Sequence, residues 1–351
     1  MKVALAHHDG ATTRMLRSVL LSLRQLTVAW TADAGDQVLE ACSRQAPDLL
    51  LLDLELIKRS PGGLVQQIML ETPCPILLLD SASGQNVRLV FQSLGHGATD
   101  VAAVPDLSRW GEADAWAGLL AQVSMLWNLS GHRTELSANQ RPMPAPARTG
   151  LPPVVAIGSS TGGPKALAAL LSRLPAHFPA AVVIVQHLDS HFVEGLASSL
   201  NEHSPLDVAA LTRPTALKPG KVWVAARPEH LVISSSLMLD WTDRWPELIC
   251  RPAIDVFFKS LAEHPELKGC GLLLTGMGRD GAEGLLAMRK AGFSTAAQDA
   301  DSSVVYGMPK AAAELGAAEA ILPIEQMADW LVDRINRLMT PGQTNHRSTE
   351  A

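Results

Sequence analysis

Short apolar runs alternate with amphipathic segments of helix length along most of this chain, and this alternation limits the folds that the chain can adopt. Within residues 1–127 the apolar runs cover 3–6, 49–53 and the segment that closes at Asp80, and a helical pattern covers 12–23. Strands that alternate with helices are typical of α/β proteins with a parallel sheet. The sequence therefore predicts an α/β domain over residues 1–127.

The alternation fails over residues 128–152, where proline is dense, and we expect a semi-rigid linker there. It returns afterwards, and apolar runs such as 181–187 and 231–234 indicate further strands. These runs predict a second and larger α/β domain over 153–339. Residues 340–351 are polar, and we expect them to form a loose tail.

The composition is that of a folded protein and limits its partners. Of the 351 residues, 47% are hydrophobic and 18% are charged, which excludes a disordered chain and fits two domains. The net charge is −6 and no run of Lys and Arg is present, so we expect no nucleic-acid partner. No apolar run approaches the roughly 18 to 20 residues that cross a bilayer, and the N-terminus lacks the features of a signal peptide. We therefore expect no membrane insertion and a cytoplasmic location.

The cysteines are too scattered to suggest a disulfide framework. They are Cys42, Cys74, Cys250 and Cys270. Because no C-x-x-C pair is present, a thiolate zinc site is not indicated either. Four buried thiols are the simplest interpretation.

The segment from Val154 to Lys165 reads V-V-A-I-G-S-S-T-G-G-P-K and contains the most informative motif. Gly158 to Gly162 matches G-x-S-x-G, in which glycines let a strand turn sharply into a helix and the central serine projects from the turn. Ser160 is therefore a candidate nucleophile. A turn rich in Gly and Ser can equally bind a phosphate with its backbone amides, although the G-x-K-[ST] of a P-loop is absent. The motif alone leaves both interpretations open.

Two further polar residues follow predicted strands of the second domain. His187 ends the run 181–187, and Asp280 follows the run 271–275 within G-M-G-R-D-G. Because the carboxyl ends of parallel strands meet at one edge of a sheet, we expect Ser160, His187 and Asp280 to converge. In a Ser-His-Asp triad the serine attacks an acyl carbon, the histidine moves the proton, and the aspartate orients the imidazole and balances its charge. The chain order differs from that of α/β-hydrolases, so we expect a different fold.

The same turns suggest supporting groups for such a site. Backbone amides at Thr161 and Met277 are candidate donors for an oxyanion hole. Asp280 has a second interpretation, as the N-cap of a helix that begins at Gly281 and Ala282, and this does not exclude a role in a triad. If His187 is the base, we expect the hydrolysis rate to rise with pH through an apparent pKa of about 6 to 7.

The second domain resembles a known family over about residues 154–331. In order along the chain, the matching segments are G-S-S-T-G-G-P, the strand ending in Q-H, R-P-A-I-D-V-F-F, L-T-G-M-G-R-D-G and V-V-Y-G-M-P-K. They resemble the protein-glutamate methylesterase family of bacterial chemosensory systems. One departure is A-A-R-P-E-H at 225–230, where relatives usually show A-P-G.

This resemblance implies both a fold and an activity. It implies a doubly wound catalytic domain that hydrolyses γ-glutamyl methyl esters on the cytoplasmic domains of methyl-accepting chemoreceptors and releases methanol. Many members also deamidate receptor glutamines. The family's catalytic serine, histidine and aspartate fall on Ser160, His187 and Asp280, and no metal or organic cofactor is implied for the hydrolysis.

The first domain resembles a response-regulator receiver, a flavodoxin-like fold, with Asp53 at the phosphoacceptor position of P-D-L-L-L-L-D-L-E. His7 and His8 replace the acidic pair that holds Mg²⁺ in receivers, Asp80 replaces a hydroxyl residue, and Val104 replaces a lysine. Imidazoles are poor substitutes for carboxylates toward Mg²⁺, which is a hard cation. We therefore predict a pseudo-receiver in which Asp53 is phosphorylated poorly or not at all.

Two alternatives stay open for this first-domain site. Asp9 or Glu55 could supply metal ligands from another register. His7, His8 and Asp53 could form a transition-metal or pH-sensitive site, or they could be polar residues at a disused site, which is the simpler interpretation.

The leading hypothesis is an ester hydrolase that acts on methylated glutamates of a chemosensory receptor, with the N-terminal domain as a regulatory or docking module. A signalling adaptor with weak or no catalysis and a serine esterase of broad specificity are the alternatives. The resemblance also suggests a chemosensory histidine kinase or array protein as a partner.

Overall fold

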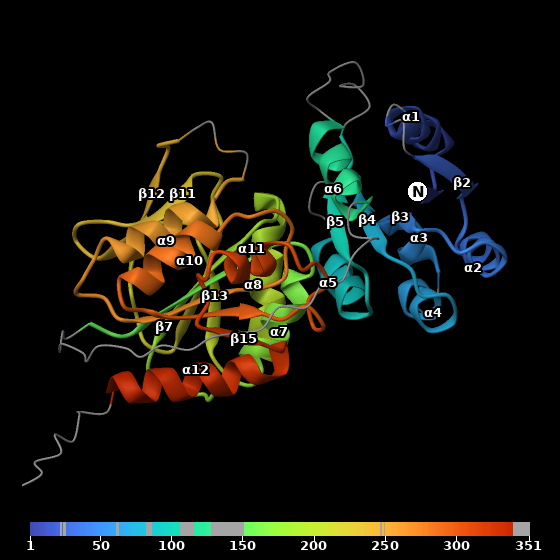
Figure 1. Ribbon diagram of the computed structural model, residues 1–351. Helices are drawn as coiled ribbons and strands as arrows, with labels where there is room; N and C mark the ends of the chain where they lie inside the picture. The colour runs from blue at the N-terminus through green and yellow to red at the C-terminus, as the bar shows by residue number, and fades with distance from the viewer. Residues whose placement is uncertain are drawn as a thin grey trace, which may run out of the picture.

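Two parallel β-sheets covered by helices, with one small antiparallel sheet, make up this computed structural model (Figure 1). The structure describes residues 1–21, 23, 26–60, 63–81, 86–105, 116–127, 151–245, 248 and 250–339. Most of the predicted linker and all of the predicted tail lie outside the described residues. None of the helices in this described part is long and apolar enough to cross a membrane.

The first sheet has five parallel strands in the order β2-β1-β3-β4-β5. Its elements are β1 (Lys2–Ala6), α1 (Gly10–Leu21), β2 (Thr27–Ala32), α2 (Gly35–Arg44), β3 (Leu49–Asp53), α3 (Leu54–Arg59), α4 (Leu64–Glu71), β4 (Ile76–Asp80), α5 (Val87–Gly95), β5 (Asp100–Ala103) and α6 (Ala117–Trp127). Strands β3 and β4 are buried along their whole length, as expected where helices cover both faces of a sheet. This strand order is the flavodoxin-like one, and it sets the carboxyl ends of β1, β3 and β4 side by side.

The second sheet has seven parallel strands in the order β15-β14-β13-β6-β7-β10-β8. Its strands are β6 (Val154–Ser159), β7 (Ala181–Gln186), β8 (Asp207–Leu211), β10 (Lys221–Ala225), β13 (Gly269–Leu273), β14 (Ser294–Gln298) and β15 (Ala320–Leu322). The helices around it are α7 (Gly163–Leu171), α8 (Ser190–His203), α9 (Ile254–Ala262), α10 (Ala282–Lys290), α11 (Met308–Glu314) and α12 (Ile324–Met339). The two sheets confirm the predicted α/β class.

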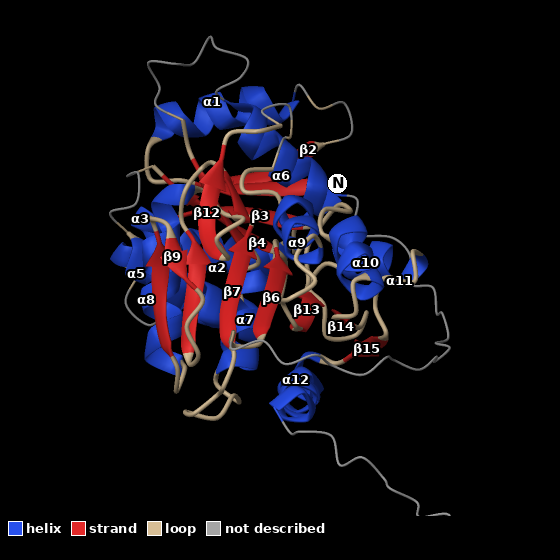
Figure 2. Ribbon diagram, turned by 90° about the vertical axis from the view of Figure 1, so that its left-hand side faces the viewer, coloured by secondary structure: helices blue, strands red, loops and turns tan. Residues whose placement is uncertain are grey.

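The order of the second sheet reverses at β6. The chain passes from β6 to β7 on one side and returns later to β13 on the other side, and Figure 2 shows β7, β6 and β13 following one another across the sheet. Open α/β sheets bind ligands at the carboxyl ends of the strands at such a switch point. The residues that follow these three strands therefore lie where a ligand is expected to bind.

Three short strands form a separate antiparallel sheet in the order β11-β12-β9. They are β9 (Thr215–Ala216), β11 (His230–Ile233) and β12 (Met238–Thr242). The run 231–234 is thus a strand, as predicted. The prediction that it belongs to a parallel sheet is wrong, because it pairs with β12 in the antiparallel sense. Only residues 234–237 connect β11 to β12, and a parallel pairing needs a crossover of roughly a dozen residues.

Helix α5 of the first domain packs against α8 of the second (Figure 1). A Cβ added at Gly195 of α8 would lie 1.5 Å from Val87 Cγ1 and 3.2 Å from Phe91 Cε2 of α5. Only glycine lets the two helices approach so closely. Phe91 and Val193, one from each helix, belong to a single cluster of buried apolar residues, so the core is continuous across the two domains.

Replacing Gly195 with leucine should separate α5 from α8. The added side chain has no room beside Val87, and overpacking of this kind costs about 1 to 3 kcal/mol. We expect a larger radius of gyration by small-angle scattering and faster amide exchange in both helices. Gly95→Ala is the matched control, because a Cβ there meets nothing within 4 Å, and it should change neither measurement. An unchanged radius and exchange pattern in Gly195→Leu would contradict the docked arrangement.

Candidate active site

The turn from β6 into α7 carries the candidate nucleophile. Strand β6 ends at Ser159, Ser160 follows it, and α7 begins at Gly163. Gly162 has a φ of 78°, in the left-handed region that glycine adopts without strain. The backbone N–H of Ser160 donates to the carbonyl oxygen of Thr275 at 3.0 Å, which ties the turn to the end of neighbouring β13. Ser160 is partly exposed at the N-terminal end of α7, where the helix dipole favours negative charge.

Gln186, the buried last residue of β7, joins the ends of β6 and β7. Its Oε1 accepts from Ser159 Oγ at 2.6 Å, and its Nε2 donates to the carbonyl oxygens of Ser160 at 2.8 Å and His187 at 3.0 Å. The amide therefore holds the backbones of two predicted site residues at a set separation. The sequence indicates this role only weakly, through a polar residue at the end of an otherwise apolar strand.

His187 and Asp280 meet above the carboxyl ends of β7 and β13. His187 Nε2 lies 2.8 Å from Asp280 Oδ2. The Asp280 carboxylate also accepts from the backbone N–H groups of Ile254 at 2.8 Å and Asp255 at 2.9 Å. Asp280 thus caps the first turn of α9, and the predicted N-cap role on the following helix is wrong, because Gly281 is the N-cap of α10.

These contacts favour the charged forms of both side chains. Burial lowers the pKa of His187, but its hydrogen bond with Asp280 and the nearby thiol of Cys250 outweigh burial and raise the pKa to about 9. Burial raises the pKa of Asp280, yet the hydrogen bond and charge of His187 hold it below its usual value. At neutral pH the pair is therefore an imidazolium and a carboxylate, whereas the sequence predicts a histidine that titrates near neutrality.

Cys250 is a neighbour of His187 that the sequence does not reveal. One donor atom from each of His187, Cys250 and Asp280 lies within 4.8 Å of the other two. Cys250 is partly exposed, so the prediction of buried thiols is wrong for it and confirmed for the other three cysteines.

Among the hydrogen bonds of the described residues, none joins Ser160 Oγ to the His187 ring. Catalytic hydrogen bonds often tighten only when substrate binds.

The predicted oxyanion donors lie on turns at the same edge of the sheet. In the described part of the chain, the backbone N–H groups of Thr161 and Met277 donate to no other group.

Thr161 Oγ1 donates to Asp100 Oδ2 of the first domain at 2.9 Å. Burial raises the pKa of Asp100 to about 6. The first domain thus reaches the turn that carries Ser160.

A groove of about 880 Å³ borders Asp280 on one side. Its lining includes Cys250, Asp280, Arg244, Trp245 and Leu248. Trp245 is 43% exposed and Leu248 is 38% exposed. Exposed aromatic and aliphatic side chains beside a reactive centre are suited to binding a protein segment.

Comparison with known proteins shows the family of this chain. The family model for the CheB methylesterase matches residues 155–331. A Burkholderia pseudomallei (strain 1710b) protein, named protein-glutamate methylesterase/protein-glutamine glutaminase 2, is 42% identical over 337 residues, which cover 96% of this chain and 98% of the relative. The chain belongs to the CheB methylesterase family.

A further full-length relative and one solved catalytic domain also match this chain. A protein-glutamate methylesterase/protein-glutamine glutaminase of Mesorhizobium japonicum is 37% identical over 342 residues, covering 96% of this chain and 99% of the relative. The crystal structure of the Thermotoga maritima CheB methylesterase catalytic domain is 34% identical, with a TM-score of 0.48, and the match covers 52% of this chain and 98% of that domain.

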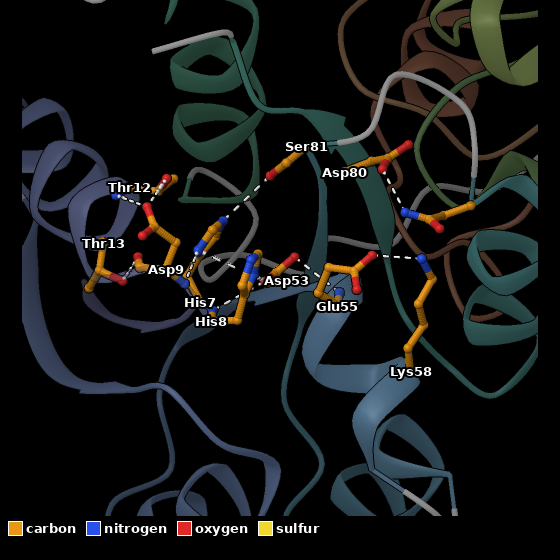
Figure 3. A network of polar contacts seen from close by, with 11 residues as sticks. His7, His8, Asp9, Thr12, Thr13, Asp53, Glu55, Lys58, Asp80 and Ser81 are labelled. Carbon is orange, nitrogen blue, oxygen red and sulfur yellow. Dashed lines mark hydrogen bonds and ion pairs between the residues drawn. The ribbon is translucent and has the colours of Figure 1, made fainter.

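The receiver-like domain of this CheB-family protein holds Asp53 in a closed set of contacts (Figure 3). Asp53 Oδ1 accepts from the Glu55 backbone N–H at 3.1 Å, and Oδ2 accepts from the His8 backbone N–H at 3.1 Å and contacts His8 Nδ1. The side chain is 1% exposed. Weak phosphorylation of Asp53 stays a prediction, and the engaged oxygens are consistent with it.

The alternative magnesium ligands are engaged in other contacts. Asp9 Oδ2 accepts from the backbone N–H and the hydroxyl of Thr12, both at 2.7 Å. Glu55 Oε1 pairs with Lys58 Nζ at 2.6 Å. Mg²⁺ requires a near-octahedral set of oxygen ligands, so the Mg²⁺ that a receiver fold implies does not fit these residues.

Gln186→Glu should destabilise the protein. A carboxylate cannot donate to the carbonyl oxygens of Ser160 and His187, and leaving buried acceptors unpaired costs about 1 to 3 kcal/mol. The free energy of unfolding, measured in urea, should fall by that amount. Gln92→Glu makes the same change at an exposed position of α5 and should leave stability within about 0.5 kcal/mol. Equal free energies of unfolding in the two variants would show that Gln186 does not hold the ends of β6 and β7 together.

Proposed function

We propose that this protein is a protein-glutamate methylesterase that hydrolyses γ-methyl esters of glutamate on the cytoplasmic domains of methyl-accepting chemoreceptors. The names of its relatives support the activity. The observation in the molecule that carries the proposal is the His187–Asp280 hydrogen bond beside the Ser160 turn at the sheet's switch point. Such a substrate puts the enzyme in the cytoplasm, with a chemosensory histidine kinase or array protein as a further partner.

The proposed reaction uses Ser160 as nucleophile and His187 as base. Asp280 occupies Nε2 of the imidazole, which leaves Nδ1 to take the serine proton as Oγ attacks the ester carbonyl carbon. His187 then gives that proton to the methoxy oxygen, methanol leaves, and the glutamyl group stays on Ser160 as an ester. Water attacks this ester by the same route, releasing glutamate and restoring the serine. One water is consumed for each methanol released.

The remaining groups at this edge support the charged intermediate. We assign the backbone amides of Thr161 and Met277 to the tetrahedral oxyanion, where each donor contributes roughly 3 to 4 kcal/mol in comparable hydrolases. The same steps on a glutamine side chain would release ammonia in place of methanol. We therefore include the glutaminase activity named for the relatives as a second reaction of this site.

We assign the first domain a regulatory role that works through docking. Its α5 packs on α8, and its Asp100 holds the hydroxyl of Thr161 next to Ser160. A domain anchored at the nucleophile's own turn restrains that turn and limits the approach of a receptor. Control by phosphorylation of Asp53 is disfavoured, because both of its oxygens are already bonded.

Ser160→Ala should lose most of the methanol release from methylated receptor. Loss of a catalytic serine removes the covalent route and leaves only the residual rate from binding and oxyanion stabilisation, a fall of about 10³-fold or more. Ser172→Ala, an exposed serine just after α7, is the control and should keep the wild-type rate. Undiminished release by Ser160→Ala would exclude the serine mechanism. Equal turnover of simple esters and methylated receptor by the wild type would favour an esterase of broad specificity.

The pH profile should follow the raised pKa of His187. The base must be neutral to accept a proton, and with a pKa of about 9 the ring is mostly protonated at pH 7. The value of kcat/KM should therefore rise through pH 7 and 8 and level off above about pH 9. Cys250→Ala removes one contact that raises this pKa, so its profile should shift to lower pH. A wild-type plateau already reached by pH 7.5 would contradict this assignment.

A further inference from the structure

A compact group of nitrogen and oxygen donors lies at the carboxyl edge of the first sheet, apart from the proposed active site (Figure 3). His7 and His8 follow β1, and Asp53 ends β3. One donor atom from each lies within 4.8 Å of the other two. The two imidazole rings are stacked, with centroids 5.0 Å apart. His7 and Asp53 are each 1% exposed, and His8 is 28% exposed.

The two ring nitrogens of His7 have different hydrogen-bond partners. The backbone N–H of Asp9 donates to His7 Nδ1 at 3.0 Å, so Nδ1 carries no proton. The proton is then on Nε2, which faces Ser81 Oγ at 3.4 Å. Nδ1 lies 3.8 Å from Asp53 Oδ2. A metal ion at Nδ1 would replace the hydrogen bond from the Asp9 N–H, while Ser81 would still hold the ring through Nε2, as the second nitrogen of a metal-ligating histidine is usually held.

Asp53 is oriented in the same way by its backbone neighbours. The Glu55 N–H holds Oδ1, and the His8 N–H holds Oδ2, each at 3.1 Å. His8 Nδ1 reaches the same Oδ2. Oδ2 is therefore the atom that both imidazoles share. The carboxylates of Asp9 and Glu55 are bonded elsewhere, so this group offers two nitrogens and one carboxylate.

We propose that His7, His8 and Asp53 bind one divalent transition-metal ion of the Zn²⁺ class. Imidazole suits such borderline ions, whereas Mg²⁺ prefers oxygen alone. Metal–nitrogen and metal–oxygen bonds of about 2 Å would connect the ion to His7 Nδ1, His8 Nδ1 and Asp53 Oδ2. His8 loses its Nδ1 proton to solvent as the ion takes the place of that proton between His8 and Asp53. Water completes the coordination at the His8 side, where the cluster is exposed.

Metal binding here would change what the first domain senses. The ion would occupy the oxygen of Asp53 that a phosphoryl group would need. Metal and phosphoryl group therefore exclude each other at this residue. In this proposal the receiver fold keeps its site at the sheet edge but responds to a different ligand. The proposal does not depend on the esterase activity.

The test is a titration of the full-length, chelator-stripped protein with Co²⁺, which reports its ligands by visible absorption. We expect one equivalent to bind, to be displaced by Zn²⁺ and to be unaffected by a large excess of Mg²⁺. Cys250→Ser should bind equally well, because that thiol belongs to the cluster around His187. His8→Ala and Asp53→Asn should each weaken binding by about tenfold or more. His96→Ala, an exposed histidine of the same domain, is the control and should bind like the wild type.

Replacing His8 with another metal-ligating residue distinguishes a loss of coordination from a change in the fold. His8→Cys should still bind Co²⁺ and should gain the near-ultraviolet charge-transfer band of a cobalt thiolate, a signal that a fold defect cannot produce. Wild-type affinity in both His8→Ala and Asp53→Asn would overturn the proposal. So would loss of the bound Co²⁺ in Cys250→Ser or its displacement by Mg²⁺.

Discussion

The parallel ladder that joins β13, β6 and β7 is the constraint on which the proposed active site depends. Its register pairs Gly158 with Leu273 on one side and Ser159 with Gln186 on the other. Because the strands run in the same direction, the residues that follow them emerge at one edge of the sheet. Segments more than a hundred residues apart in sequence are thereby brought together before any side chain of the site makes a contact.

Two kinds of polar contact then convert this edge into a site. Gln186 joins backbone groups across β6 and β7, and Asp280 joins the imidazole of His187 to the first turn of α9. Gln186 is buried and Asp280 is 18% exposed, and each has several partners, so each positions its neighbours closely and is costly to lose. Asp280 in particular receives two backbone N–H groups as well as the ring, which keeps it ionised opposite an imidazolium.

The sequence predicts the strands, the G-x-S-x-G turn and the edge at which the polar residues gather, because short apolar runs and glycine-rich turns are local signals. It does not predict contacts that depend on packing between distant segments. The position of Cys250 beside His187 is one such contact, and the capping of α9 by Asp280 is another. The raised pKa of His187 follows from its contacts with Asp280 and Cys250. The antiparallel pairing of β11 depends on a four-residue connection whose length outweighs the apolar pattern of the strand.

The most direct test of the account is to ask whether Ser160 is an activated nucleophile. The full-length protein would be treated with a fluorophosphonate, an electrophile that modifies activated serines, and the modified residue would be located by peptide mass spectrometry. We predict modification of Ser160, with the rate greatly reduced in His187→Gln and in Asp280→Asn. Modification of a different residue, or modification of Ser160 at the same rate without His187, would contradict the claim that the sheet edge assembles these three residues into one catalytic unit.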